Sequence, residues 1–231
     1  MKIIGLIGGM SWESSIEYYQ IINETVRTKL GGLHSAKCIM YSVDFAEIEP
    51  LQHQARWNEA TQMMIAATKS VERGGADFVI FCTNTMHKVA DDVQKQIQIP
   101  ILHIADATAE RIKAQGVKRV GLLGTKFTME GDFYKERLIQ KHGLEVMIPN
   151  DREREIVHRI IYDELCVGEI KESSKIKYTD IIERLAKDGA EGIILGCTEI
   201  GLLVKKEDSR VPLFDTMRIH AVAAVEYALE P

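Results

Sequence analysis

The chain has no surplus of basic residues: among its 231 residues, 29 Lys and Arg stand against 34 Asp and Glu, a formal net charge of −5. Proteins that bind nucleic acid usually neutralise phosphates with a basic surplus, so we expect no nucleic-acid partner. The chain also lacks a stretch of about 20 apolar residues, which a bilayer-spanning helix requires, so we expect no membrane partner. The first apolar run, in MKIIGLIGGMSWESS, is too short for a signal peptide, which favours a cytoplasmic protein.

Motifs that bind metals or nucleotides are also missing. The four cysteines lie far apart without a CxxC pair, which argues against a zinc knuckle or a redox motif and predicts free thiols in a reducing compartment. The seven histidines form no HExxH spacing, so we expect no metal site. Most lone histidines are surface or satisfied core residues. His87 and His103 could orient a cleft, but we do not expect either to act directly in catalysis. Neither a GxGxxG nor a P-loop motif occurs, which disfavours a dinucleotide or nucleotide cofactor.

What the sequence contains is an alternation of strands and helices. Hydrophobic residues make up 45% of the chain and charged residues 27%, which is typical of a soluble globular protein. Short runs rich in Ile and Val alternate with amphipathic stretches that end at glycines, a pattern typical of βαβ units. The expected strands are residues 3–7, 37–43, 78–82, 101–104, 120–123, 145–148 and 192–195. This predicts an α/β fold with mostly parallel sheets, in which ligands bind beyond the carboxyl ends of the strands.

Three segments of the first half recur in the second half, in the same order. VGLLGTKFTMEGDFY from Val120 matches IGLIGGMSWESSIEY from Ile4, DGAEGIILGCTE from Asp188 matches GGADFVIFCTNT from Gly74, and VPLFDTMR from Val211 matches IPILHIAD from Ile99. The offsets are 116, 114 and 112. Units of the βα type resemble one another anyway, but three ordered matches at nearly one offset favour duplication.

The repeat predicts two pseudo-symmetric, three-layer α/β/α domains with an active-site cleft between them. We expect the first domain to comprise residues 1–100 and 212–231, and the second to comprise residues 101–211. Their size fits the lower range for domains. Two such halves related by an approximate two-fold axis would each present one reactive group to a bound ligand.

The repeat register also selects the reactive groups. Cys197 follows the expected strand 192–195, and the offset of 114 sets Thr83 opposite Cys197 and Cys82 opposite Gly196. Because neighbouring side chains of a strand point to opposite faces, Thr83 is expected to enter the cleft while Cys82 points away from it as buried filler. The catalytic candidates are therefore Cys197 and Thr83.

Four segments together carry a resemblance to a known family. GLIGGMSWES, CTNT, GCTE and PLFDT, spread over essentially the whole chain, resemble the aspartate/glutamate racemases. The resemblance implies an isomerase that needs no cofactor, acts on a small amino acid, and uses two facing cysteines as paired acid and base. Thr83 stands at the position of the first of these cysteines. Because the second cysteine of the family faces the α-proton of the L-enantiomer, the resemblance implies that this chain prefers L-substrates.

Racemisation needs a base on one face of the α-carbon and a proton donor on the other. A thiol suits the task because its pKa of about 8.5 can be lowered by nearby donors. We expect the N–H groups of the helix after Cys197, together with Thr198, to stabilise a thiolate. Thr83 does not ionise near neutrality, so we expect its hydroxyl to donate or relay a proton rather than to act as a base.

The remaining candidates bind substrate. Gly9 and Met10 follow the first strand, Thr125 and Lys126 occupy the matching place in the second half, and both are turns whose N–H groups could hold a carboxylate or simply close a tight turn. Asn84, Thr85 and Thr198 could bind the α-carboxylate or α-amine, or cap the helices that begin there. Glu199 could accept the substrate ammonium or stabilise a helix start. The resemblance implies that Gln52, expected in a loop before the helix at Trp57, covers the cleft.

Several alternatives stay open. Some relatives bind a distal carboxylate with an Arg and a Lys, but residues 43–47 and 161–166 show no such basic pair, so a broad-specificity amino-acid racemase is one alternative. A single-cysteine decarboxylase of the same superfamily and a non-catalytic small-acid binding protein are two others. Relatives are often dimers, and a homodimer stays open because no residue decides it.

Overall fold

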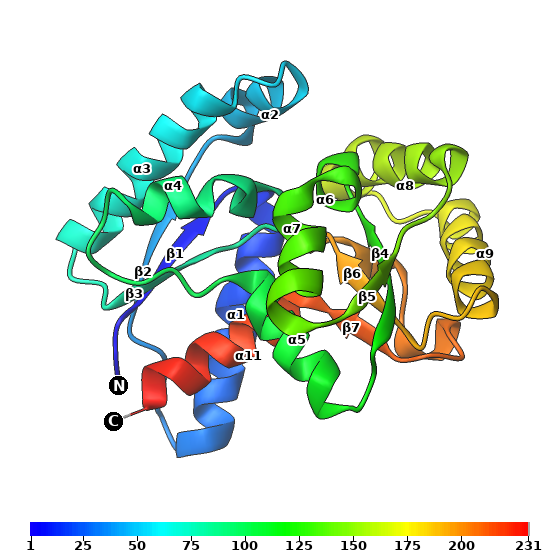
Figure 1. Cartoon of the computed structure of the whole chain (residues 1–231). Coiled ribbons are helices and arrows are strands. Elements are labelled where there is room, and N and C mark those ends of the chain that lie inside the picture. Colours follow the sequence, from blue (N-terminus) through cyan, green and yellow to red (C-terminus); the bar gives the residue numbers. More distant parts are fainter. Residues whose placement is uncertain (231) are drawn as a thin grey trace. The chain divides into compact units, whose positions relative to one another are not determined.

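The structure is a computed structural model that describes residues 1–230. The chain divides into two compact units, each built on its own sheet (Figure 1). Unit 1 comprises Met1–Ile104 and the segment from His220 to the C-terminus, and unit 2 comprises Ala105–Ile219. Among the described residues, no helix has the length and apolar character that crossing a membrane requires.

Unit 1 contains a three-stranded parallel sheet of order β2-β1-β3. Its strands are β1 (Ile4–Gly8), β2 (Cys38–Ser42) and β3 (Phe78–Phe81). A single parallel bridge between Val79 and Ile101 continues the sheet beside β3, so only this residue of the expected strand 101–104 pairs. The helical elements that lie wholly within Met1–Ile104 are α1 (Trp12–Leu30), α2 (Phe45–His53), α3 (Trp57–Arg73), η1 (Thr85–Val89) and α4 (Ala90–Gln94).

Unit 2 contains a four-stranded parallel sheet of order β5-β4-β6-β7. Its strands are β4 (Arg119–Gly124), β5 (Glu145–Met147), β6 (Gly192–Gly196) and β7 (Leu213–Asp215). The helical elements are α5 (Ile104–Ala114), α6 (Lys126–Glu130), α7 (Asp132–Glu136), η2 (Arg137–Lys141), α8 (Asp151–Asp163), η3 (Leu165–Val167), α9 (Glu172–Lys187), α10 (Ile200–Leu203), η4 (Lys206–Asp208) and α11 (Thr216–Leu229). From His220 onward α11 belongs to unit 1.

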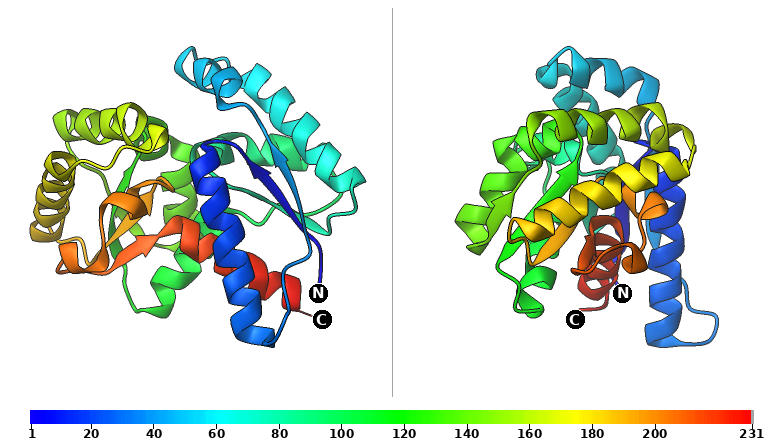
Figure 2. Two further views of the ribbon diagram at one scale, coloured as in Figure 1. Left: turned by 180° about the vertical axis from the view of Figure 1, so that it is seen from behind. Right: turned by 90° about the vertical axis from the view of Figure 1, so that its right-hand side faces the viewer.

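Helices cover both faces of each sheet, and glycines of the central strands mark the close approaches (Figure 2). A Cβ atom at Gly5 of β1 would meet Val71 of α3 at 2.8 Å, and one at Gly8 would meet the Ser15 hydroxyl of α1 at 2.6 Å. Because Gly5 and Gly8 point to opposite faces, α3 and α1 lie on opposite sides of the sheet. Gly121 and Gly124 of β4 likewise approach α9 and α6. The predicted α/β class with mostly parallel sheets is confirmed.

The helices over the first sheet follow from simple apolar spacing. In α3, the buried residues Ala60, Met64, Ala67 and Val71 recur every three or four positions and form one apolar face. They join the core beneath them with Ile7 of β1 and other buried residues. Burial of a large aliphatic side chain contributes roughly 1.5–3 kcal/mol, so this stripe is what holds α3 on the sheet.

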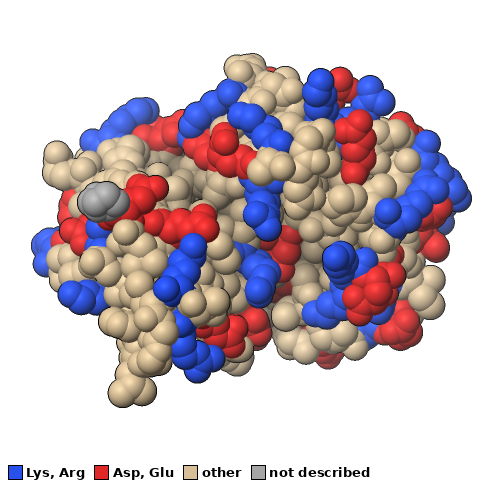
Figure 3. Space-filling model, turned by 90° about the horizontal axis from the view of Figure 1, so that it is seen from below, with Lys and Arg blue, Asp and Glu red and all other residues tan. Residues whose placement is uncertain are grey.

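The boundaries between the units differ from those expected. Leu213–Asp215 pairs with β6 and so lies in the second sheet, whereas the expected first domain began again at residue 212. The chain passes between units at 104/105 and at 219/220, at the start of α5 and inside α11. On the face drawn in Figure 3, acidic and basic side chains lie interspersed.

Candidate functional site

The two sheets share one ladder register, which fixes the equivalent residues of the two units. Ile4 of β1 pairs with Phe78, and Val120 of β4 pairs with Gly192. Val120 lies 116 residues after Ile4, and Gly192 lies 114 residues after Phe78, the same offsets as in the sequence repeat. The bridge from Val79 to Ile101 recurs as the pairing of Ile193 with Leu213.

Continuing this register beyond the strand ends places Thr83 at the position of Cys197. Cys82 takes the position of Gly196, the partner of Gly124. The Cys82 side chain is wholly buried, whereas Thr83 and Cys197 keep 7% and 9% of their surface exposed. Burial raises the pKa of the Cys82 thiol, which is therefore protonated and inert.

In unit 2, Cys197 forms a small buried cluster with the two residues that follow it. Its Sγ donates a hydrogen bond to Glu199 Oε2 at 2.9 Å, and the Thr198 hydroxyl donates to the same oxygen at 2.8 Å. Thr198 and Glu199 are each only 2% exposed. One carboxylate oxygen thus holds both the thiol and the hydroxyl in place.

This cluster changes the expected protonation of Cys197. Burial, followed by the negative charge of Glu199, raises the pKa of the Cys197 thiol well above its usual value. The Glu199 backbone N–H lowers the pKa of the thiol, as expected of a donor after the strand, but burial and the Glu199 charge outweigh it. The Thr198 hydroxyl does not help, because it directs its proton to Glu199 and not to the sulfur. The helix that follows, α10, has only four residues, which leaves little helix dipole to help. Cys197 is therefore a thiol here, hydrogen-bonded to a carboxylate.

In unit 1, Thr83 begins a buried turn that leads into η1. The Thr83 carbonyl oxygen lies 2.8 Å from Nδ1 of His87, and His87 Nε2 lies 3.2 Å from the backbone nitrogen of Ile104. The His87 ring contacts the His103 ring at a centroid distance of 4.5 Å. His87 and His103 are both buried. No group of three or more His, Cys, Asp or Glu side chains within residues 1–230 is arranged to hold a metal ion.

Gln52 lies in a helix and not in the expected loop. It belongs to α2, is 2% exposed, and its Nε2 donates to the Met86 sulfur at 3.1 Å. Met86 follows Thr85 directly, so Gln52 packs against the turn that carries Thr83. The loop expectation failed because Pro50 sits inside α2, where proline usually ends a helix.

The first strand-to-helix turns are largely satisfied by their own side chains. Gly9 N–H donates to Ser15 Oγ at 2.8 Å, and Ser11 accepts from the Ser14 backbone as the N-cap of α1. Met10, between them, is buried. These contacts describe a tight turn rather than an array of open N–H donors.

The matching turn in unit 2 is similar. Thr125 is the N-cap of α6 and accepts from the backbone nitrogen of Thr128. The Lys126 backbone nitrogen lies 3.2 Å from His158 Nδ1, and the Lys126 ammonium forms an ion pair with Glu155. The Lys126 and Thr128 N–H groups thus each have an acceptor within the protein, and carboxylate binding at Gly9, Met10, Thr125 and Lys126 stays a prediction.

Asn84, Thr85 and Thr198 lie where the sequence placed them, next to the two candidate catalytic residues. Asn84 precedes η1, but its side chain makes no capping hydrogen bond to that helix. Thr198 donates to Glu199, and Glu199 itself precedes α10 without capping it through its side chain. The capping alternative is wrong for Asn84, and the ligand-binding alternatives for Asn84, Thr85, Thr198 and Glu199 stay predictions.

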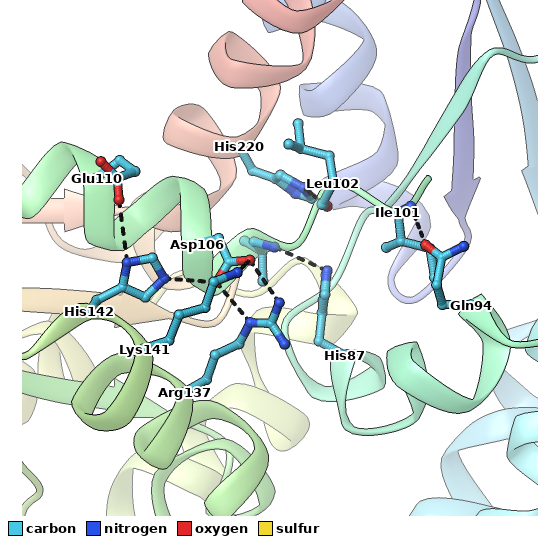
Figure 4. A network of polar contacts seen from close by, with 11 residues as sticks. His87, Gln94, Ile101, Leu102, Asp106, Glu110, Arg137, Lys141, His142 and His220 are labelled. Carbon is cyan, nitrogen blue, oxygen red and sulfur yellow. Dashed lines mark hydrogen bonds and ion pairs between the residues drawn. The ribbon is translucent and has the colours of Figure 1, made fainter. Parts of the chain in front are cut away.

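The sequence suggested that His87 could orient the site, and its contact with the Thr83 carbonyl follows the i,i+4 spacing of a helical turn. Another feature was missed from the sequence. In unit 2, Asp106 receives hydrogen bonds from Arg137, Lys141 and His142 (Figure 4). Burial opposes the charge of Asp106, but these three donors hold the pKa of its carboxyl well below its usual range. This cluster ties α5 to η2 and is structural.

Comparison with known proteins gives one consistent result. Residues 7–224 match the family described as Asp/Glu/Hydantoin racemase. The broad specificity amino-acid racemase RacX of Bacillus subtilis (strain 168) is 24% identical over 233 residues, which covers 96% of each chain. A solved structure assigned as an Asp/Glu racemase from Yersinia pestis is 57% identical with a TM-score of 0.92, and an aspartate racemase homologue from Pyrococcus horikoshii OT3 is 42% identical with a TM-score of 0.85. Both alignments cover 100% of each chain.

Proposed function

Because the chain belongs to the Asp/Glu/hydantoin racemase family, we propose that it is a cofactor-independent amino-acid racemase whose base is Cys197 and whose opposite-face proton donor is Thr83. One observation carries this proposal. The shared ladder register makes Thr83 and Cys197 equivalent residues at the ends of the corresponding strands β3 and β6. In a protein built from two such halves, equivalent strand ends are where a ligand would meet one group from each half.

Substrate binding would bring a positive charge, the α-ammonium group, that favours ionisation of the Cys197 thiol. In the described state the thiol proton points at Glu199 Oε2. An α-ammonium group beside Glu199 would offset the negative charge that now raises the pKa of the thiol. The thiol can then release its proton to solvent while Glu199 stays ionised, and the thiolate takes the α-proton of the L-enantiomer. The reactive thiolate would thus form only in the presence of substrate.

Reprotonation would occur from the other face. The Thr83 hydroxyl gives its proton to the planar carbanion while it receives one that originates from solvent. Cys197 then carries the former α-proton and releases a proton to solvent, so that protons and charge balance over the cycle. The Thr83 step is the slower one because a hydroxyl is a far weaker acid and base than a thiol.

Aspartate and glutamate are the substrates that we propose first, on the strength of the family. A broader substrate range is the second candidate, and one contact favours it. Lys126, the cation next to the unit 2 turn, is already paired with Glu155 and so is not set to bind a distal carboxylate. RacX, a relative along nearly the whole chain, is named for broad specificity. L-glutamate and a neutral amino acid such as L-alanine should therefore be assayed side by side.

Replacing each buried cysteine tests the assignment. Cys197→Ala should lower α-proton exchange of L-glutamate or L-aspartate in deuterated water by about 10²–10⁴-fold, because the variant lacks the base. Cys82→Ala is the matched control and should stay within about twofold of the unaltered protein, since Cys82 only fills core space. Proton NMR of the α-position measures both.

The same assay separates the rival functions. A decarboxylase would release carbon dioxide and a product of lower mass, whereas racemisation conserves mass. A binding protein would hold the amino acid without exchanging its α-proton. Loss of exchange only in Cys82→Ala would overturn the register on which the proposal stands.

A further inference from the structure

His87 joins two segments that lie apart in the sequence. Its Nδ1 lies 2.8 Å from the Thr83 carbonyl oxygen, and its Nε2 lies 3.2 Å from the backbone nitrogen of Ile104. Ile104 is the last residue before the chain passes into unit 2. His87 itself is only 2% exposed and packs against Phe81 and His103. One buried imidazole therefore bridges the Thr83 turn and the crossing segment.

The two partners fix the proton on the ring. A backbone N–H can only donate, so Nε2 of His87 must accept from Ile104 with its lone pair. Nδ1 then carries the proton and donates it to the Thr83 carbonyl, which can only accept. Both bonds are made at once only by the neutral Nδ1–H form.

A second buried histidine holds the same crossing segment. His220 Nε2 lies 2.8 Å from the Leu102 carbonyl oxygen, and its Nδ1 lies 2.9 Å from the Tyr18 hydroxyl. Here the carbonyl requires the proton on Nε2, the opposite tautomer to that of His87. His220 is thus a matched partner: it belongs to the same ring cluster but does not bond to Thr83.

The unit 2 counterpart of this arrangement is different. By the repeat offsets, the positions of His87 and His103 correspond to Gly201 and Asp215. These two positions also touch, since a Cβ atom at Gly201 would lie 2.9 Å from Asp215 Oδ2. Glycine has no side chain to reach the Cys197 carbonyl, so the imidazole brace is specific to the Thr83 side.

We propose that His87 is a positioning residue that fixes the Thr83 carbonyl, and with it the turn that aims the Thr83 hydroxyl at the substrate. This inference rests on the proposed racemase function. It predicts a specific defect: when the brace is lost, Cys197 still removes the α-proton from an L-substrate and returns one to the same face. Delivery of a proton from the Thr83 face becomes slow.

Two variants at the same position separate the two bonds. The side-chain amide of His87→Asn can take the place of Nδ1 and keep the bond to the Thr83 carbonyl. The side-chain oxygen of His87→Gln can take the place of Nε2 and keep the bond from Ile104. Both variants lose the ring contact with His103, so a difference between them does not come from that loss of packing.

The readout is the ratio of two products of L-glutamate in deuterated water: recovered L-glutamate that carries α-deuterium, and D-glutamate. His87→Gln should lower D-glutamate formation at least about tenfold more than deuterium exchange into L-glutamate. His87→Asn and the control His220→Gln should keep the ratio of the unaltered protein. A merely structural role would lower exchange and inversion together.

The outcomes distinguish this inference from the function beneath it. An unaltered protein that produces neither exchange nor D-glutamate overturns the racemase proposal itself. An active unaltered protein combined with an unchanged ratio in His87→Gln, or a collapsed ratio in His87→Asn, overturns only the role of His87. If His87→Gln fails to fold, as judged by circular dichroism, His87→Ala takes its place, since it also loses the bond to the Thr83 carbonyl: its ratio should fall, and an unchanged ratio would overturn the role of His87.

Discussion

At the scale of single residues, the two buried cysteines Cys82 and Cys197 lie in different surroundings. Cys82 is sealed in the core, whereas Cys197 shares its proton with Glu199. The sequence was sufficient to distinguish them, because the repeat register sets Cys82 opposite a glycine and Thr83 opposite Cys197. It was not sufficient to predict the protonation of Cys197, which depends on side-chain rotamers that bring the Glu199 carboxylate onto the thiol.

His220 should make the stability of the protein depend on pH. Complete burial lowers the pKa of His220 to about 4, although its bond to the Leu102 carbonyl opposes this. Histidine in the unfolded chain titrates near 6.5, so between pH 6.5 and 4 the unfolded state binds the additional proton. The contribution of neutral, buried His220 to the free energy of unfolding is therefore fully present above pH 6.5 and is lost as the pH falls from 6.5 to 4. We expect the free energy of unfolding to drop by about 2 kcal/mol between pH 7 and pH 5 from this group alone.

Urea unfolding at pH 7 and at pH 5 measures this loss. His220→Gln provides the comparison, since it removes the titrating group and keeps a donor for the Leu102 carbonyl. The variant should be less stable at pH 7 but should lose less stability on acidification. An identical loss in the variant and the unaltered protein would assign the pH dependence to other groups.

At the scale of elements, sequence reasoning succeeded where a regular pattern exists. Periodicity located the strands β1 to β6 but not β7 (Leu213–Asp215), and the ladders reproduce the repeat offsets. It failed where one residue overrides the pattern. Pro50 concealed α2, and the expected strand 101–104 forms a single bridge at Ile101 before α5 begins at Ile104.

The turn after β1 shows how one glycine sets the geometry of an element junction. Gly9 has a φ of 89°, and a Cβ atom there would lie 2.1 Å from the Val43 carbonyl oxygen. Gly9→Ala should therefore lower the free energy of unfolding by more than about 3 kcal/mol, since strain at positive φ and a backbone clash add together.

Gly75→Ala is the matched control for this prediction. Gly75 has a φ of 96°, but nothing lies within 4 Å of a Cβ atom at that position. The control should lose only about 1–2 kcal/mol, the cost of positive φ for an alanine. Chemical denaturation of both variants gives the difference, and equal losses would mean that the contact with Val43 is readily relieved.

At the scale of the whole molecule, duplication accounts for most of the architecture. The equivalences extend beyond the strand pairing to the glycines that the helices approach, Gly5 and Gly8 in unit 1 and Gly121 and Gly124 in unit 2. They also include the contact between His87 and His103, whose counterparts Gly201 and Asp215 lie close together as well. The family match over residues 7–224 includes both units. The unit boundaries could not be predicted from the repeat. After the bridge residue Ile101 of unit 1, α5 lies almost wholly in unit 2, and after β7 of unit 2, the end of α11 lies in unit 1.

The two halves are alike in fold but unequal in chemistry, and this inequality is the central claim. A thiol stands at one strand end and a hydroxyl at the equivalent one. Because the enantiomers have equal free energy in water, the kcat/KM values for racemisation must be equal in both directions. The proposed inequality is therefore best tested by α-proton exchange, in which each enantiomer would report the base on its own side.

The most direct test compares the initial rates of α-proton exchange of L-glutamate and D-glutamate in deuterated water, for the unaltered protein and for Thr83→Cys. We predict that the unaltered protein exchanges the L-enantiomer at least about tenfold faster, because only Cys197 provides an efficient base. Thr83→Cys should raise exchange of the D-enantiomer and narrow that ratio. Equal rates for the two enantiomers in the unaltered protein would contradict the account.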